Sequence, residues 1–505
     1  KDEGRKAEDG RRRAEAATPL SPGAFETATA GDVSTAALSG SDSTATSNVH
    51  RTSVQPERQP DGFAAVVGWE HVGQSDVGDG CSPVVEPGSA EEVCEVLRIA
   101  ERERWNVIPT GVGAQSDVGA GAQAGHTLAL KTTRLARLVE HEPADLVATA
   151  EAGMTLADFN REVGRAGQWL PLDPPGAGGA TLGGVVATGA AGAQSPGYGA
   201  PRSHVLGMKV ALAGGRVIRA GGRVVKNVAG YDLCKLFTGS HGTLGVILEI
   251  TFRLRPRPRR EATLVARSND LGELVDAARS LVTSQLLPVA VELLSHGMGA
   301  AVGLTRDSSA ESAEASHYMV ARFAGTEGAV EYQLARAAEL VAERAKGADV
   351  SSAAEDDGVW ASVAGRTSAG GAAHGLVWRA SVPPAALGAL LARLPKVDEC
   401  ASHLNWHAGA GDGRLRVYGG TPPGSQTTEG DNLRAARFLG EMRAAASEAG
   451  GSLVVERCGP KFRDGFDAWG LTESAALLMA RVKEQLDPSN TFSPGRCGFI
   501  LQSRD

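Results

Sequence analysis

The chain has 505 residues, which is enough for two or three domains with a large buried core. Its 51 Lys and Arg residues against 59 Asp and Glu residues give a net charge of −8, which gives no reason to expect a nucleic-acid partner. The sequence contains no run of about 18 or more apolar residues, so no membrane span is expected.

The N-terminal segment, residues 1–58, has the composition of a disordered tail. It is charged at first and then rich in Ser, Thr, Ala and Gly, with few large apolar residues to offset the entropy of ordering. It lacks the apolar core of a signal peptide, and it does not begin with Met, as is expected of a fragment. We therefore expect a cytoplasmic protein, with association at the inner membrane face through partners as the alternative.

Order is expected from about Gly62. The segment 82–87 is typical of a short strand, and Ser89 then caps a helix whose apolar face carries Val93, Val96, Leu97 and Ala100. The next strand, 106–109, leads directly into a glycine-rich loop. Further strands are predicted over 128–130, 146–149 and 205–210, a helix over 155–166, and a hairpin at Gly214-Gly215. Mixed strands with few helices between them favour an α+β fold over a doubly wound sheet.

Pro256, Pro258 and the basic residues around them mark a boundary, after which a second α+β domain is expected. Strands are predicted over 289–294, 318–323, 376–379 and 414–418, and a helix over 331–345. The last predicted helix, 472–486, has Leu478, Val482 and Leu486 at i+4 spacing and ends at Asp487-Pro488.

Two glycine-rich segments are candidates for ligand binding. In the first, Pro109 to Ser116, Gly111 and Gly113 allow positive φ, so that successive N–H groups form a concave nest for phosphate, with Gln115 and Ser116 as further donors. The second, residues 176–189, is made of small residues, with Thr181 and Thr188 as its hydroxyls, and suits a flat ring system. Neither is a Walker A sequence, and the first lacks the third glycine of the Rossmann fingerprint. Each segment by itself is also compatible with an ordinary flexible loop.

The stretch from Gly222 to Glu249, GRVVKNVAGYDLCKLFTGSHGTLGVILE, closely resembles the flavin domain of the vanillyl-alcohol oxidase / p-cresol methylhydroxylase superfamily. Within it the chain resembles most the smaller FAD-binding subunit of bacterial glycolate oxidase. The likeness extends from about Gly62 to Pro258 and resumes at 376–383 and 487–496. It implies an FAD-binding PCMH-type domain over 59–260, a substrate or cap α+β domain over 261–455, and a C-terminal segment, 456–505, that packs back toward the FAD domain.

The resemblance also implies which residues hold FAD. The first loop would wrap the diphosphate, the second would line the flavin and ribityl region, and 245–247 would face the nucleotide end, with Lys226, Asn227 and Tyr231 near the flavin. The implied cofactor-binding residues are Gly111, Val112, Gly113, Ala114, Gln115, Ser116, Pro174, Thr181, Gly183, Gly184, Ala187, Thr188, Gly189, Gly192, Asn227, Tyr231, Gly245, Val246 and Ile247. Core packing is the alternative for Tyr231 and Val246. Some superfamily members tether FAD through His or Cys; the first loop has no His, so we expect non-covalent FAD.

A 2-hydroxy acid needs a cation for its carboxylate and a base near its hydroxyl. Arg379 is the candidate cation, His407 the candidate base, and Lys226 a third candidate catalytic residue; for the first two, a surface or interface position is the alternative. Relatives of the resembled family that bind a metal carry Gly-Asp-Gly-Asn-x-His and Glu-His-Gly. Here the His positions hold Arg416 and Cys458, and a guanidinium offers no lone pair, so no metal site of that type is expected.

The cysteines give no sign of a metal site either. None of the six forms a CxxC pair, so neither a zinc ribbon nor an iron–sulfur cluster is indicated, and reduced thiols are expected. They are Cys81, Cys94, Cys234, Cys400, Cys458 and Cys497.

Three functions agree with this sequence. The first is an FAD-dependent oxidoreductase subunit that oxidises a small 2-hydroxy acid such as glycolate by hydride transfer to flavin, beside a larger flavin subunit and an iron–sulfur subunit. The second is a stand-alone FAD dehydrogenase with another substrate. The third is a non-catalytic flavin-binding or electron-relay subunit, because a fold by itself does not specify a reaction.

Overall fold

The computed structural model describes residues 60–75, 82–113, 126–222, 231–304, 316–353, 358–365, 375–394, 404–419, 429–458, 462 and 466–498. The predicted tail, 1–58, lies outside the described residues, as do Cys81 and Cys400. Within the described ranges, no helix is both long and apolar enough to cross a membrane. The described chain combines helices with several sheets, as the expected α+β class requires.

The first sheet of the N-terminal domain has the order β1-β2-β4-β3 in the described chain. Its strands are β1 (Val72–Ser75), β2 (Ser82–Val85), β3 (Asn106–Thr110) and β4 (Thr127–Lys131). β2 and β3 run parallel to β4, whereas β1 runs antiparallel to β2. Helices α1 (Asp61–Val67) and α2 (Ala90–Arg102) share a core with it. The predicted cap is confirmed, since Ser89 Oγ accepts from Glu92 N at 3.1 Å.

The second sheet is antiparallel, with the order β5-β6-β10-β8-β9. Its strands are β5 (Leu138–Glu142), β6 (Val147–Glu151), β8 (Val205–Ala211), β9 (Val217–Gly221) and β10 (Val246–Arg253). The Gly214-Gly215 turn joins β8 to β9 as predicted, with φ of 69° and 72°. The helices beside this sheet are α3 (Leu156–Gly164), α4 (Leu182–Thr188), α5 (Ser195–Tyr198), α6 (Pro201–His204) and α7 (Leu233–Phe237). A two-stranded pair, β7 (Gln168–Trp169) and β11 (Arg255–Pro256), precedes the third sheet.

The third sheet carries the second domain and has the order β15-β12-β14-β13-β17-β18-β16-β19. Its strands are β12 (Arg260–Ser268), β13 (Ala290–Leu294), β14 (His317–Gly325), β15 (Asp349–Ala353), β16 (Val377–Ser381), β17 (Asn405–Gly409), β18 (Arg414–Tyr418) and β19 (Ser452–Arg457). Its helices are α8 (Leu271–Val282), α9 (His296–Ala301), α10 (Glu327–Arg344), α11 (Val359–Gly365), α12 (Leu387–Leu391) and α13 (Glu429–Glu448). Helix α10 begins one turn before the predicted 331–345, because Val330 adds a buried contact at its start. The domain limits drawn from the sequence stay predictions.

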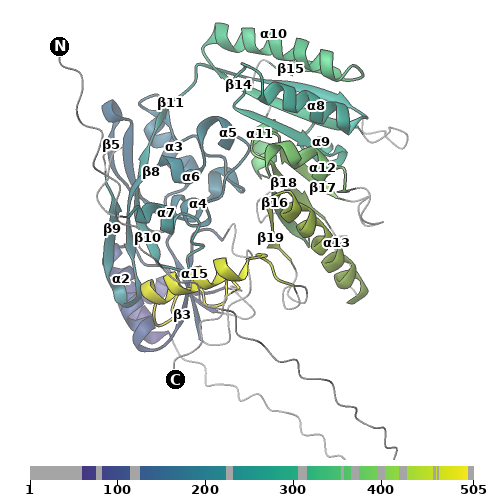
Figure 1. The fold of residues 1–505 in the computed structure, drawn as a ribbon. Helices are drawn as coiled ribbons and strands as arrows, with labels where there is room; N and C mark the ends of the chain where they lie inside the picture. The colour runs from purple at the N-terminus through teal and green to yellow at the C-terminus, as the bar shows by residue number, and fades with distance from the viewer. Residues whose placement is uncertain are drawn as a thin grey trace, which may run out of the picture. The chain divides into compact units, whose positions relative to one another are not determined.

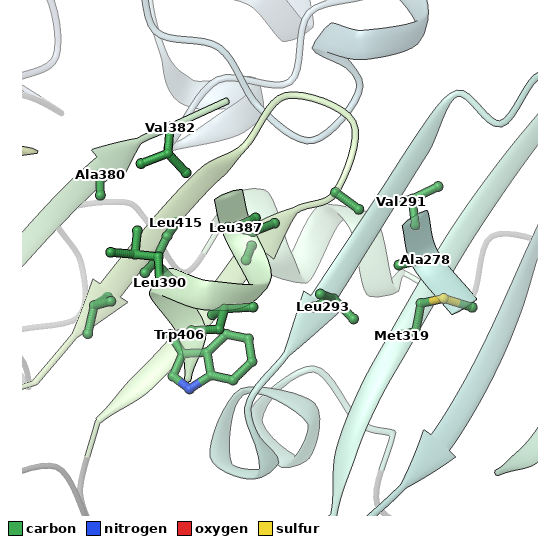
Figure 2. Close-up of a cluster of buried hydrophobic side chains, with 14 of the residues drawn as sticks. Ala278, Val291, Leu293, Met319, Ala380, Val382, Leu387, Leu390, Trp406 and Leu415 are labelled. Atoms are coloured by element: carbon green, nitrogen blue, oxygen red, sulfur yellow. The ribbon is translucent and has the colours of Figure 1, made fainter. Parts of the chain in front are cut away.

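The two faces of this sheet differ in chemistry, because successive side chains of a strand point to opposite faces. On one face, Val291, Leu293, Trp406 and Leu415 join a core with helices α8, α10, α12 and α13. Figure 2 shows Leu387 and Leu390 of α12 next to Leu415, and Ala278 of α8 next to Met319. The opposite face carries a separate apolar cluster that includes Ala290, Leu294 and Val320. It also carries the charged and polar residues Glu292, His407, Arg414 and Arg416, which form the networks described below.

The C-terminal segment returns to the first domain. Phe492 forms a parallel bridge with Val107 of β3, and the buried Lys483 Nζ donates to Thr243 O at 2.8 Å and to Phe492 O at 2.7 Å. Figure 1 shows helix α15 (Glu473–Leu486), in yellow, beside β3 and β10. The predicted apolar spacing on α15 holds for Val482 and Leu486, which pack on the first-domain core. It is wrong for Leu478, which is 65% exposed because the first half of α15 extends beyond that core.

Candidate functional site

A cleft lies in the first domain, where the end of β3, helix α4, the start of β10 and the C-terminal segment meet. The described residues that line it are Ile108, Pro109, Thr110, Gly111, Val112, Gly113, Thr132, Pro174, Pro175, Ala180, Thr181, Gly183, Gly184, Val185, Ala187, Thr188, Ala190, His241, Gly242, Gly245, Val246, Ile247 and Arg496.

Glycines make the two loops fit against each other. A Cβ on Gly111 would collide with the Thr181 side chain, and one on Gly183 would lie 2.8 Å from the Cβ of Ala152. On the opposite wall, a Cβ on Gly245 would lie 2.8 Å from the carbonyl oxygen of Ala211. Larger residues at these positions would therefore push the walls apart, which explains the run of small residues in the sequence.

The chemistry of the cleft wall suits an anionic dinucleotide with a flat ring system. Of the described lining residues, none is acidic, Thr110, Thr132, Thr181 and Thr188 supply hydroxyl groups, and Arg496 supplies a cation. The remaining lining is largely backbone and small apolar side chains, which leave room for a planar ring. FAD, expected from the resemblance, carries a diphosphate and an isoalloxazine, and the residues present fit both.

The structure brings twelve of the nineteen expected cofactor-binding residues to this one cleft. They are Gly111, Val112, Gly113, Pro174, Thr181, Gly183, Gly184, Ala187, Thr188, Gly245, Val246 and Ile247. Ala114, Gln115, Ser116 and Asn227 lie outside the described residues, as does Lys226.

Three expected cofactor residues lie elsewhere. Gly189 ends α4 in the left-handed conformation, with φ of 62°. Gly192 packs on Asp173, and its carbonyl accepts from Arg414 Nη1 at 2.9 Å. Tyr231 is 97% exposed, so it neither lines the cleft nor packs in the core.

The sequence analysis missed His241 and Arg496 as cleft residues. Both lie inside the stretches that carry the family resemblance, and this was the available signal. The sequence separates them by 255 positions, yet Arg496 Nη1 donates to His241 O at 3.4 Å. Only the return of the C-terminal segment to the first domain brings them together.

A cluster of two arginines and one glutamate lies on the polar face of the third sheet. Glu456 on β19 accepts from Arg416 Nε at 2.8 Å and Arg416 Nη2 at 2.9 Å, and from Arg379 Nε at 2.9 Å. Burial raises the pKa of the Glu456 carboxyl, but the charges of Arg416 and Arg379 outweigh this and hold it at about 2. The cluster therefore carries one net positive charge. Arg416 is buried, whereas a third of the Arg379 side chain is exposed.

A second network connects this face to the first domain. Arg414 on β18 donates from Nη2 to Glu292 Oε1 at 2.6 Å and from Nη1 to Asp412 Oδ2 at 2.5 Å. Ser195 Oγ donates to Asp412 Oδ2 at 3.1 Å. Together with the bond from Arg414 to the Gly192 carbonyl, this fixes the segment 192–195 of the first domain against the sheet.

His407 belongs to this second network and is not a surface residue. It is 3% exposed, its Nδ1 lies 2.8 Å from Glu292 Oε2, and its Nε2 lies 3.1 Å from the Tyr418 hydroxyl. Both ring nitrogens are thus hydrogen-bonded, and burial lowers the pKa of the imidazole. Its position on a central strand, with a carboxylate and a phenol on its two sides, argues against the predicted role of base.

Arg416, which replaces a His of the metal-binding relatives, is bonded twice to Glu456, and Cys458 is buried. In the part of the chain that the structure describes, no group of three or more His, Cys, Asp or Glu residues is arranged to hold a metal ion.

Comparison with protein families finds two matches along the chain. The family described as FAD binding domain matches residues 82–221, and the family described as FAD linked oxidases, C-terminal domain, matches residues 257–497. The first contains the cleft residues from Ile108 to Ala190, whereas the wall formed by residues 241–247 lies between the two matches. The second contains the third sheet and the C-terminal segment.

Related proteins include a D-lactate dehydrogenase of Anaerostipes hadrus, 28% identical over 83% of this chain and 90% of that protein. Glycolate oxidase subunit GlcD of Bacillus subtilis is 31% identical over 42% of this chain and 45% of that protein. Subunit GlcE of Escherichia coli is 42% identical over 28% of this chain and 40% of that protein. The chain thus matches less than half the length of the two glycolate oxidase subunits.

Among solved structures, p-cresol methylhydroxylase with substrate bound superposes with a TM-score of 0.68, at 17% identity over 88% of this chain and 97% of that one. At that identity the similarity concerns the fold. Alkyldihydroxyacetonephosphate synthase gives a TM-score of 0.63 over 82% of this chain and 77% of that one, at 16% identity.

Proposed function

Because the chain belongs to the FAD-linked oxidases of the vanillyl-alcohol oxidase / p-cresol methylhydroxylase superfamily, we propose that it oxidises a small 2-hydroxy acid such as glycolate or D-lactate. The observation that supports this substrate class is the Arg379–Glu456–Arg416 cluster, with its net positive charge and its one partly exposed guanidinium. The relatives named after D-lactate, glycolate and D-2-hydroxyglutarate agree with an acidic substrate.

FAD is held non-covalently in this proposal. The loop 111–113 and Thr181 lie where they can hold the diphosphate, and the wall of small residues from 183 to 188 receives the ring system. Bound FAD supplies the acceptor for the two electrons and the hydrogen of the substrate C–H bond. Precipitation of the protein with acid should release all of the flavin into the supernatant, and flavin that stays with the pellet would contradict non-covalent binding.

Arg379 binds the substrate carboxylate. Its Nε is bonded to Glu456 and its Nη1 to Ser381 Oγ at 2.7 Å, which fixes the plane of the guanidinium. Within the described part of the chain, its Nη2 has no hydrogen-bond partner, so an edge of the fork remains for a carboxylate oxygen. A guanidinium held in this way loses little side-chain freedom when it binds an anion.

The central experiment is anaerobic absorbance of the purified, FAD-loaded chain with glycolate, D-lactate and D-2-hydroxyglutarate. Loss of the oxidised flavin band with at least one of these acids is the expected result. Flavin that stays oxidised with every acid, with the protein alone and with its partners, would reject the proposal.

A second candidate is a subunit that relays electrons or acts only in a glycolate-oxidase-like complex, beside a larger flavin subunit and an iron–sulfur subunit. The match to glycolate oxidase subunits GlcD and GlcE favours it. In that case the isolated chain binds FAD but is reduced only when the partners are added. Reduction of the isolated chain by a hydroxy acid favours the stand-alone dehydrogenase instead.

A further inference from the structure

His241 is the histidine that lines the cleft, among the residues that the structure describes. Its imidazole packs edge-on against the indole of Trp469, with ring centroids 4.9 Å apart and an interplanar angle of 74°. Trp469 is itself fixed, because its indole N–H donates to Arg496 O at 2.6 Å. The C-terminal segment therefore sets the orientation of the His241 ring and also places Arg496 beside it.

The backbone of His241 has a conformation that residues other than glycine rarely adopt. Its φ is 52°, in the left-handed region. The conformation is held by the His241 N–H, which donates to Ala187 O at 2.7 Å, and by Arg496, which donates to the His241 carbonyl. Residues held in such conformations cluster at active sites, where the strain fixes a side chain in place.

Three charged groups act on the imidazole. Arg496 comes from the C-terminal segment, and Arg379 and Glu456 come from the polar face of the third sheet. Burial lowers the pKa of His241, and the positive charges of Arg496 and Arg379 lower it further, to about 4. The ring is therefore neutral near pH 7 and has a lone pair to accept a proton. His407, in contrast, has both nitrogens engaged inside the sheet network.

From its place on the cleft wall, with its ring packed against Trp469 and Arg496 bonded to its carbonyl, we propose that His241 is the catalytic base that removes the hydroxyl proton of the 2-hydroxy acid. This inference rests on the proposed function. In the reaction, the C–H hydrogen leaves with its electron pair to oxidised flavin, and the O–H proton passes to the imidazole. The carbon–oxygen single bond becomes a carbonyl, so the substrate loses two electrons and the flavin gains them.

The same geometry connects substrate binding to the strength of the base. A substrate carboxylate on Arg379 neutralises one of the two positive charges that disfavour protonated His241. The imidazole then accepts a proton more readily than in the free protein. A neutral ligand, or an acid held elsewhere, would not produce this change.

The kinetic test compares the anaerobic rate of flavin reduction in wild-type protein, H241Q and H241N, each saturated with FAD. We expect a loss of about 100-fold or more in the limiting rate for both variants, with the substrate Kd changed by less than about threefold. H71Q, at a partly exposed histidine of the first domain, is the matched control and should retain the wild-type rate. The wild-type limiting rate should fall as the pH approaches the raised pKa of the substrate-bound imidazole, and this acid limb should be absent in the variants.

A second readout does not depend on turnover. In protein labelled with ¹⁵N-histidine, the resonances of His241 are assigned by their absence in H241Q. They should titrate near pH 4 in the free protein. With oxalate bound as the carboxylate probe, they should titrate at a pH at least one unit higher. An imidazole that is already charged at pH 7, or that does not respond to oxalate, would overturn the assignment. Wild-type flavin that no acid reduces would reject the proposed function and with it the base, whereas equal reduction rates in wild type and H241Q would reject the base alone.

Discussion

Arg379 and Arg416 share one carboxylate, but they differ in what else can reach them. Arg416 is buried and bonded twice to Glu456, so its charge is largely compensated by that carboxylate inside the sheet. Arg379 shares only its Nε with Glu456, and its outer edge is partly exposed. Arg416 thus stabilises the glutamate, and Arg379 is the arginine that a substrate carboxylate can reach.

Replacing Arg379 with Lys tests this difference. Lys keeps the charge but loses the planar fork, so we expect the Kd of the hydroxy acid to rise about tenfold or more, with FAD content unchanged. The dependence of the anaerobic rate of flavin reduction on the acid concentration measures the Kd. R393K, at an exposed arginine paired with Glu448 at 3.5 Å, is the control. An R379K protein with the wild-type Kd would show that the carboxylate binds elsewhere.

Asp173 precedes the cleft residue Pro174, and its environment favours the neutral acid. Burial raises the pKa of its carboxyl to about 6, although the N–H of Gln194 donates to it at 2.9 Å and Arg414 acts in the opposite direction. The folded state therefore holds this proton more tightly than the unfolded state. Between the unfolded pKa of about 4 and the folded value, the folding stability falls as the pH rises.

Asp173→Asn removes this titration and keeps an oxygen for the Gln194 N–H. We expect the variant to be more stable than wild type by about 1–2 kcal/mol at pH 7.5, with the difference vanishing near pH 4. Urea unfolding at the two pH values measures it. Asp145→Asn, at an exposed aspartate, should change neither midpoint. A D173N protein less stable than wild type at pH 7.5 would mean that the ionised carboxylate is favoured in the fold.

At the scale of elements, the alternation of side chains along the strands of the third sheet places the charged residues together on one face. On β18, Arg414 and Arg416 alternate with Leu415 and Val417. All four side chains are buried, but only Leu415 and Val417 belong to the apolar core. Pairing of β17 and β18 brings His407 opposite Arg416. A shift of one residue in this register would move the arginines into the core and the leucine into the network.

Helix caps differ in what they contribute. The Ser89 side chain caps α2, whereas Thr326 precedes α10 without a side-chain cap bond. We therefore expect Ser89→Ala to cost about 1 kcal/mol of unfolding free energy and Thr326→Ala to cost much less. Chemical denaturation of both variants checks this, and equal losses would show that the Ser89 bond contributes little.

At the scale of the whole molecule, the contact between two segments that are distant in the sequence decides whether a metal ion can bind on the third sheet. Arg416 on β18 and Glu456 on β19 are joined across the sheet, and Arg416 stands where the family resemblance implies a metal-binding His. A guanidinium bound to a carboxylate fills this place with a fixed positive charge.

Treatment with EDTA followed by desalting should leave the rate of flavin reduction within about twofold of the untreated protein, because Arg416 cannot ligate a metal. Elemental analysis of the purified chain should find no stoichiometric zinc or manganese. A bound metal whose removal abolishes reduction would contradict this prediction, and restoration by added metal would show that the loss is specific.

The sequence by itself determined the local elements, the glycine-rich loops and the family, because these depend on patterns within short stretches. Ser89, Gly111, Thr181 and the strand that contains Arg379 could each be predicted from their neighbours. Tertiary structure alone decided the site. It buried His407, exposed Tyr231, and brought His241 and Arg496 together from positions 255 residues apart. Burial and long-range charge set the pKa of a side chain, and neither is a property of the residues next to it in the chain.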